Sequence, residues 1–210
     1  MDEQTYWDKQ HDKYLGTDWI NKPSLFAEWV LQYLPPNGSL LDLGAGQAQD
    51  SQYFAKKKYA VTATDFSWHA LEIAKQKSSG SIVFQQVDLS KPLPYKDASY
   101  DIVYAHLSLH YFDASKTQSL FDEIYRVLKP NGILAALFNS DQDPEIAEGK
   151  QLESNYIELD GIRKRYFNVE DARKFASKYQ IIVADNDGTT YKDKAKGIHN
   201  LIRLVAQKAT

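Results

Sequence analysis

Short apolar runs alternate along the chain with segments in which apolar residues recur every three or four positions. Residues 40–43 predict a short buried strand, and similar runs follow at 59–65, 81–88, 100–107 and 133–138. Helical spacing is clearest in residues 118–128, where Leu120, Phe121 and Ile124 share one face with Tyr125 and Leu128. Strands that alternate with helices predict βαβ units, and hence a mostly parallel sheet with helices on both faces.

The ends of the chain have a different pattern. Residues 23–36 predict a helix that ends at Pro35-Pro36. Further helices are expected from about Asp50 and after Ser67, whose side chain can cap a helix start. In the last third, Asp160-Gly161 separates two extended runs and predicts a hairpin turn. Asn168 predicts a helix cap, and residues 180–184 and 200–206 predict two late strands that complete the sheet with an antiparallel edge.

Composition limits the classes of function. The 210 residues suffice for one well-buried domain, and a net charge of −3 without a long basic block argues against nucleic acid and membrane partners. The longest apolar run, 132–138, is too short to span a bilayer, and the first 14 residues lack the apolar core of a secretory signal, so we expect a cytoplasmic protein. The lack of cysteine excludes cysteine nucleophiles and cysteine-ligated metal sites. We expect no metal, and a monomer or homodimer.

Polar and glycine residues stand where the predicted parallel strands end. Gly44-Ala45-Gly46 follows the first strand, Asp65-Phe66 the second, Asp88-Leu89 the third and Ala105-His106 the fourth. Ligands of open α/β sheets bind beyond these strand ends. Asp65 follows Gly46 by nineteen residues, close to the spacing of about 20 at which a carboxylate takes ribose hydroxyls. Taken singly, each feature also fits an ordinary turn or helix cap; the ordered set favours a nucleoside-containing ligand.

These residues carry a resemblance to a known family. Residues 40–75, with Asp42, Gly44 and Gly46, resemble the opening of a class I S-adenosylmethionine (SAM)-dependent methyltransferase. Asp65 resembles the family's ribose-binding residue and Asp88 lies in its adenine-binding motif, while residues 100–112 and 124–138 resemble its fourth and fifth motif regions. The layout is also similar to the branch of tellurite-resistance and thiopurine methyltransferases. The resemblance implies a doubly wound, Rossmann-like, seven-stranded sheet with an antiparallel C-terminal strand.

The glycine loop separates this family from dinucleotide-binding proteins. A dinucleotide loop places a third glycine at position 49, which is Gln49 here, to pack closely around a pyrophosphate. SAM has no phosphate, and the family's third glycine falls one residue earlier, at Ala48. An NAD(P)-linked oxidoreductase therefore remains the weaker alternative. A non-catalytic SAM-binding regulator stays open as well, because methyl transfer needs no signature nucleophile.

The resemblance implies one domain over residues 1–210, with an N-terminal helical cap at 1–35 and a hairpin-containing insertion at 139–167 near the substrate entrance. His106, His110 and Tyr111, after the fourth strand, are the candidate substrate-contacting or catalytic residues. The N-terminal segment resembles one that folds over the cofactor. The residues expected to bind SAM are Asp42, Gly44, Ala45, Gly46, Asp50, Asp65, Phe66, Asp88, Leu89, Ala105 and His106, with Tyr6, Trp7 and Tyr14 as the cover.

The resemblance to methyltransferases also limits the expected class of methyl acceptor. Amino-group nucleic-acid methyltransferases resemble one another in a proline-containing motif after the fourth strand, whereas residues 105–108 here contain no proline. Cytosine-C5 methylation uses a cysteine, and metal-dependent catechol-type enzymes carry an aspartate where His106 stands. A small molecule is therefore the expected acceptor, methylated by in-line displacement.

Overall fold

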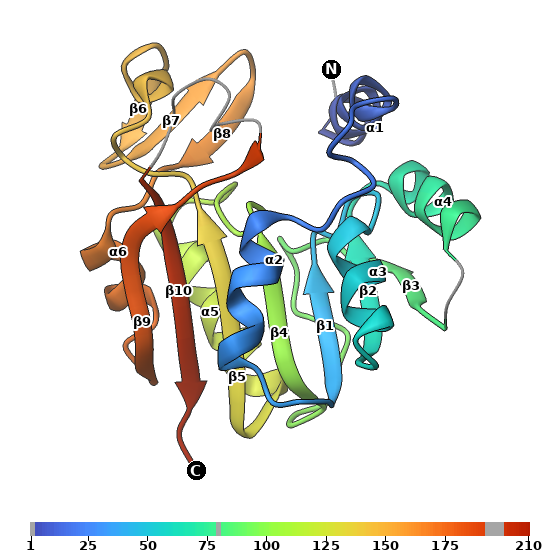
Figure 1. Ribbon diagram of the computed structural model, residues 1–210. Coiled ribbons are helices and arrows are strands. Elements are labelled where there is room, and N and C mark those ends of the chain that lie inside the picture. Colours follow the sequence, from blue (N-terminus) through green and yellow to red (C-terminus); the bar gives the residue numbers. More distant parts are fainter. Residues whose placement is uncertain (1–2, 79–80, 192–199) are drawn as a thin grey trace.

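The computed structural model describes residues 3–78, 81–191 and 200–210 and centres on one twisted sheet (Figure 1). Its seven strands run in the order β3-β2-β1-β4-β5-β10-β9. The first five are parallel where they pair, and β10 is antiparallel to both β5 and β9. The predicted fold class is thus confirmed. The bounds are β1 Ser39–Leu43, β2 Ala60–Asp65, β3 Val83–Gln86, β4 Tyr100–His106, β5 Leu128–Phe138, β9 Tyr179–Gly188 and β10 Leu201–Lys208.

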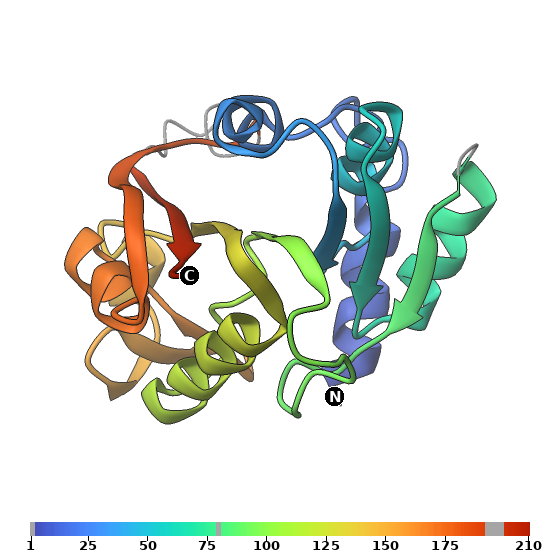
Figure 2. The same ribbon diagram turned by 90° about the horizontal axis from the view of Figure 1, so that it is seen from below.

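Helices cover both faces of the sheet because successive strand residues point to opposite sides (Figure 2). Leu41, Val103 and Leu134 pack toward α5 (Ala114–Val127) and α6 (Val169–Phe175). Their neighbours Leu40, Ile102 and Ile133 pack instead with Phe26, Val30 and Phe54. Those last three side chains belong to α2 (Leu25–Val30) and α3 (Gln49–Lys56), and α4 (Trp68–Lys77) packs beside β2 and β3. Both faces of the sheet are therefore buried, as its continuous apolar runs require.

Two predicted helix caps are present. The Ser67 hydroxyl accepts a hydrogen bond from the Ala70 N–H at 3.0 Å, and Asn168 Oδ1 accepts one from the Asp171 N–H at 2.8 Å. The helix predicted over 23–36 is divided into α2 and a 3-10 turn, η1 (Leu31–Tyr33), before the two prolines. Each of these caps accepts the N–H three residues further along the chain, as the local sequence predicts.

The start of β5 differs from the prediction. Residues 129–132 are expected to form a turn before a strand at 133, but β5 already begins at Leu128. Tyr100 pairs with Leu128 and Ile102 with Ile133, so the intervening residues bulge out of the ladder, with Asn131 at φ +64°. The bulge retains the sharp local bend that the sequence predicts while the strand continues on both sides.

A small second sheet and the N-terminal helix lie at the same end of the molecule. The insertion contains η2 (Pro144–Ala147) and strands β6 (Lys150–Glu153), β7 (Tyr156–Leu159) and β8 (Ile162–Arg165), which pair antiparallel in that order. Asp160 and Gly161 form the predicted hairpin turn with φ values of +52° and +79°. In Figure 1 this sheet and α1 (Glu3–Tyr14) stand on either side of the end toward which β1 and β5 point. Within the part of the chain that the structure describes, no helix has the length and apolar character needed to cross a bilayer.

Candidate functional site

A cavity of about 910 Å³ lies at the carboxyl ends of the parallel strands. Its floor is formed by the loop after β1 and by the residues that follow β2 and β4. Helix α1 lines one side, and the insertion with β8 lines the other. The topology explains the position, because all five parallel strands deliver their last residues to this edge.

The glycine loop needs its glycines because other parts of the protein approach it closely. Gly44 has φ +74°, and a Cβ there would overlap the Cβ of Ser108, whose hydroxyl donates a hydrogen bond to the Leu43 carbonyl. Gly46 has φ +54°, and its Cβ would lie 3.0 Å from Cε1 of His11. Ala48 is also left-handed, at φ +57°, which accounts for the glycine that the family places there.

Asp65 connects the glycine loop to the start of α4. It is 9% exposed, and its two carboxylate oxygens accept hydrogen bonds from the N–H groups of Gly46 and Ser67, each at 2.8 Å. Burial raises the pKa of Asp65, while nearby His11 and these N–H groups oppose the rise. A carboxylate accepts about four hydrogen bonds. Asp65 therefore keeps accepting capacity for hydroxyl groups of a ligand in the cavity.

Asp42 and Asp50 line the cavity but are also bonded within the protein. Asp42 accepts the Ser51 hydroxyl at 2.6 Å, and burial raises the pKa of Asp42 to about 8. The Asp50 carboxylate accepts the Ser24 N–H, the Ser24 hydroxyl and the Tyr104 hydroxyl at 2.6, 2.8 and 2.7 Å. Asp50 thereby joins the start of α2 to β4, in addition to its place at the first turn of α3.

The residues after β3 form a more open part of the cavity wall. Asp88 accepts the Ser90 N–H at 2.9 Å and pairs with Lys91 at 3.2 Å. Partial burial opposes its ionisation, but these two partners outweigh that effect and hold the pKa of Asp88 below its ordinary value. Phe66 and Leu89 line the same region. An ionised acceptor thus lies beside two apolar side chains.

Helix α1 brings three aromatic side chains to the cavity. Tyr6, Trp7 and Tyr14 all line it, and the Trp7 ring makes edge contacts with Tyr6 at 5.2 Å and Tyr111 at 4.9 Å. Three polar contacts hold the helix to the domain. Asp8 accepts the Ser67 hydroxyl at 2.6 Å, Asp12 pairs with His69 at 2.9 Å, and the Gln47 amide donates to the His11 carbonyl at 2.8 Å.

The residues after β4 line the side of the cavity that faces the insertion. His106 ends the strand and stacks near Phe26, with ring centroids 6.4 Å apart. His110 is 1% exposed, and burial, Lys164 and His106 lower its pKa to about 3, so it is neutral. The Tyr111 ring lies 4.4 Å from His110, and burial raises the pKa of Tyr111, which keeps the phenol protonated.

The structure brings together nearly all the predicted site residues but not Ala105. Its side chain is fully buried in the core that faces α5 and does not line the cavity, because Ala105 and His106 point to opposite faces of β4. The expectation that Ala105 takes part in cofactor binding stays a prediction. The Asp160-Gly161 turn itself does not line the cavity either, whereas Ile162, Arg163 and Lys164 of β8 do.

Sequence reasoning missed several lining residues, and two of them had a usable signal. His11 lies between Trp7 and Tyr14 at helical spacing, so it shares their face of α1. Asn139 directly follows β5, as His106 ends β4. Lys164 and Glu145 form an ion pair at 2.8 Å across the insertion, which only the tertiary structure reveals.

Unpartnered buried polar atoms gather in this cavity. Among the residues that the structure describes, buried atoms without a hydrogen-bond partner include Nδ1 of His11, Oε1 of Gln49 and Nδ1 of His110. All three residues line the cavity. Because native proteins leave few buried polar atoms unbonded, these atoms fit a site that holds a polar ligand. No group of three His, Asp or Glu side chains in the described ranges is arranged to hold a metal ion.

Comparison with known proteins agrees with this geometry. Residues 41–136 match the methyltransferase domain family. YqeM of Bacillus subtilis, named as a methyltransferase, is 35% identical over 127 residues, which are 59% of this chain and 50% of YqeM. The ubiquinone/menaquinone biosynthesis C-methyltransferase UbiE of Desulfotalea psychrophila is 36% identical over 101 residues, 47% of this chain and 40% of UbiE. The chain thus spans about half the length of the curated relatives it matches.

A solved structure shares the fold. The 1,6-didemethyltoxoflavin-N1-methyltransferase of Burkholderia thailandensis, with bound 1,6-didemethyltoxoflavin and S-adenosylhomocysteine, superposes with a TM-score of 0.74 at 18% identity. The superposition covers 98% of this chain and 85% of that one. This likeness shows a shared fold, and residues 41–136, which match the methyltransferase domain family, contain the glycine loop, Asp65, Asp88 and His106.

Proposed function

We propose that this chain is an enzyme that transfers a methyl group from SAM to a small-molecule acceptor. The observation that carries the proposal is one continuous cavity with two different parts. One part contains the glycine loop, Asp65 and Asp88. The other contains His106, His110 and Tyr111. A methyl donor and an acceptor must meet in one site that orients both, and this cavity provides such a site.

The first part of the cavity offers suitable contacts for each portion of the cofactor. Asp65 has the remaining accepting capacity for ribose hydroxyls. Asp88 can accept from an exocyclic amine, with Phe66 and Leu89 against the ring faces. The Gly44–Gly46 backbone and the α1 rings border the methionyl side. When bound, SAM supplies an electrophilic methyl group on its sulfonium sulfur.

The second part of the cavity orients the acceptor and excludes water. Tyr111 and Trp7 present aromatic surface, and His106 and His110 present imidazole nitrogens. The cavity volume of about 910 Å³ falls within the range of small-molecule sites, roughly 300–1,000 Å³. UbiE and the toxoflavin enzyme are named for small-molecule pathways or substrates, which supports an acceptor of this class. The absence of nucleic-acid and membrane partners, the cytoplasmic location, the oligomeric state and the tellurite/thiopurine placement stay predictions.

Calorimetric titration with SAM and S-adenosylhomocysteine tests the proposal. The wild type should bind both, and Asp65→Ala should weaken binding by about 100-fold, because it removes a buried charged acceptor. Asp187→Ala is the matched control, since Asp187 lies on β9, pairs with Arg203 of β10 and is outside the cavity. A wild type that binds neither compound would contradict the proposal.

Turnover requires a second measurement. Incubation with SAM and a broad panel of phenols, carboxylic acids, amines and thiols should release S-adenosylhomocysteine with at least one acceptor. Tight SAM binding without release for any acceptor would favour the non-catalytic regulator instead.

A further inference from the structure

The buried His110 side chain is paired with the half-buried Asn139 side chain in the acceptor part of the cavity. Nδ2 of Asn139 lies 3.4 Å from Nε2 of His110, and both residues line the cavity. His110 is 1% exposed, and its other ring nitrogen, Nδ1, has no hydrogen-bond partner among the described residues. An unbonded polar atom at such depth is costly, so its presence calls for a ligand.

One short segment fixes the backbone of both residues. The Arg165 N–H donates to the His110 carbonyl at 2.7 Å, and the Phe167 N–H donates to the Asn139 carbonyl at 2.8 Å. The guanidinium of Arg165 also donates from Nε to the Phe112 carbonyl at 3.1 Å. Residues 165–167 therefore bridge the loop after β4 and the residue after β5 and hold the pair at a set separation, although its members are 29 positions apart in the sequence.

The hydrogen bond determines which imidazole nitrogen carries the proton. An amide nitrogen only donates, so Nε2 must accept and a neutral ring must carry its proton on Nδ1. The charged and titratable groups that face His110 are Lys164 on β8 and His106 on β4, and both disfavour an imidazolium. Burial acts in the same direction. The ring thus presents a neutral N–H donor.

We propose that Asn139 is a positioning residue for His110, and that the pair directs the Nδ1–H donor to an acceptor anchored through an anionic or carbonyl oxygen. This inference rests on the function proposed above and specifies the acceptor class of the same site. Aromatic rings beside the pair favour a planar acceptor, because Tyr111 lies 4.4 Å from His110 and contacts Trp7. A phenolate, an enolate or an aromatic carboxylate meets both conditions.

The acidic side chains of this region do not favour an ammonium ligand. Glu145 accepts from Lys164 and from the Tyr166 hydroxyl at 2.6 Å. Asp113 and Asp143 cap α5 and η2 by accepting backbone N–H groups. Glu145 is engaged by the Lys164 ammonium at both oxygens and by the Tyr166 hydroxyl, whereas the unbonded atom of His110 is itself a donor. The complementary ligand group is a hydrogen-bond acceptor.

The tautomer of His110 is the first test, by ¹⁵N-histidine NMR of the full chain with S-adenosylhomocysteine. The chain has five histidines, and His110→Gln identifies the resonances of His110 by their loss. We expect a single neutral form protonated on Nδ1 between about pH 5.5 and 8. Asn139→Ala should convert it to a mixture of tautomers, while Asn186→Ala, on β9 outside the cavity, should leave it unchanged. A wild-type ring protonated on Nε2, or on both nitrogens, would overturn the inference.

Three single-ring probes test the acceptor class: phenol, benzoate and benzylamine. We expect phenol or benzoate to shift the Nδ1 resonance of His110. Asn139→Ala should lower the affinity for that probe by about tenfold. Benzylamine should bind at least tenfold more weakly than the better oxygen probe, because its ammonium cannot accept the hydrogen bond from Nδ1–H of His110. A tenfold difference is about what one hydrogen bond to a charged group contributes. Stronger binding of benzylamine, or no binding of either oxygen probe, would overturn the acceptor class. Calorimetric binding of S-adenosylhomocysteine in the same samples separates these failures from failure of the proposed function.

Discussion

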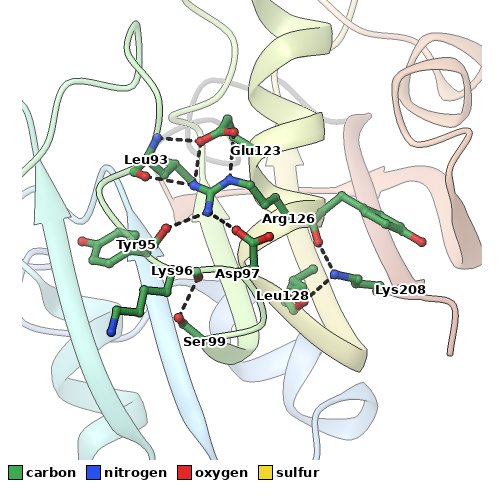
Figure 3. A network of polar contacts seen from close by, with 10 residues as sticks. Leu93, Tyr95, Lys96, Asp97, Ser99, Glu123, Arg126, Leu128 and Lys208 are labelled. Carbon is green, nitrogen blue, oxygen red and sulfur yellow. Dashed lines mark hydrogen bonds and ion pairs between the residues drawn. The ribbon is translucent and has the colours of Figure 1, made fainter.

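The two ends of the central sheet differ in the hydrogen bonding of their polar groups. At the end where the parallel strands begin, Arg126 of α5 bonds to both oxygens of Glu123, to Asp97, and to the carbonyls of Leu93 and Tyr95 (Figure 3). Lys208, in the same network, donates to the carbonyls of Tyr125 and Leu128, each at 2.7 Å. This network ties the loop before β4, helix α5 and the last strand together.

The end where the strands finish has the reverse character. There the glycine loop lies between Ser108 and His11, and the unbonded atoms of His11, Gln49 and His110 face one region. Burial raises the pKa of Asp42 to about 8 and lowers that of His110 to about 3. The network at the first end stabilises the fold, whereas the second end retains unsatisfied and neutral groups that suit ligand binding. Substitutions at the two ends should therefore have different effects.

Arg126→Ala should have the largest effect on stability. It removes hydrogen bonds to two carboxylates and two carbonyls, so we expect the free energy of unfolding to fall by about 3 kcal/mol in urea titrations. Affinity for S-adenosylhomocysteine, measured below the unfolding transition, should not change. Arg173→Ala removes an exposed arginine of α6 and serves as the control. An equal loss of cofactor affinity in Arg126→Ala would show that the two ends are coupled.

Asp42→Asn should stabilise the protein at alkaline pH. The folded-state pKa of about 8 lies above the ordinary value of 3.8, so the folded state holds a proton that the unfolded state has lost. The stability contribution is present at low pH and is lost as pH rises from about 4 to 8. Asparagine cannot ionise and keeps an acceptor for Ser51. We expect the melting temperature of the variant to exceed that of the wild type by at least about 5 °C at pH 9 and to match it at pH 4. A difference that does not vary with pH would contradict this.

Much of the fold could be predicted because local sequence determines it. The apolar strands, the caps at Ser67 and Asn168 and the Asp160-Gly161 turn depend on residues within a few positions of one another. Strand β6 was missed because all four of its residues are exposed, so it has no alternation of apolar and polar positions. Its existence depends on pairing with β7.

The candidate site was predictable only in part, for a related reason. The strand-end rule located Asp65 and His106, which end β2 and β4, and Asp88, which lies two residues after β3. The partner of His110, Asn139, is 29 positions away and directly follows β5. The contact of His11 with Gly46 joins α1 to the first loop. Such pairings arise from topology and leave no local pattern. The sequence also could not indicate that Ser108 lies against Gly44 and His11 against Gly46.

Ala48→Gly tests the small irregularity of the glycine loop. Ala48 has φ +57°, so glycine would relieve about 1 kcal/mol of backbone strain. Loss of a buried methyl group and the greater freedom of glycine in the unfolded chain offset this relief by about the same amount. We expect the free energy of unfolding to change by less than about 1 kcal/mol, and cofactor affinity to stay the same. Gly161→Ala is the control for strain alone, because its φ is +79° and a Cβ there contacts nothing within 4 Å. If Ala48→Gly raised the free energy of unfolding by much more than Gly161→Ala lowers it, the Ala48 side chain would also be straining its neighbours.

Asp12→Asn should have the smallest effect on stability, and that effect should be confined to α1, which lines the cavity. The Asp12–His69 pair joins α1 to α4 at 2.9 Å, with side chains 58% and 42% exposed, so it contributes about 0.5 kcal/mol. The hydrogen bond that His69 donates to Asp12 raises the pKa of His69, so this contribution is present at low pH and is lost as pH rises through the folded-state value. Hydrogen exchange of the α1 amides should therefore be about twofold faster in the variant near pH 6, and the same in both proteins near pH 9. Asp8→Asn, which weakens the bond to the Ser67 hydroxyl, should accelerate exchange at both pH values because the hydroxyl partner does not titrate in this range. Equal acceleration at both pH values in Asp12→Asn would show that the charge on His69 does not hold α1 in place.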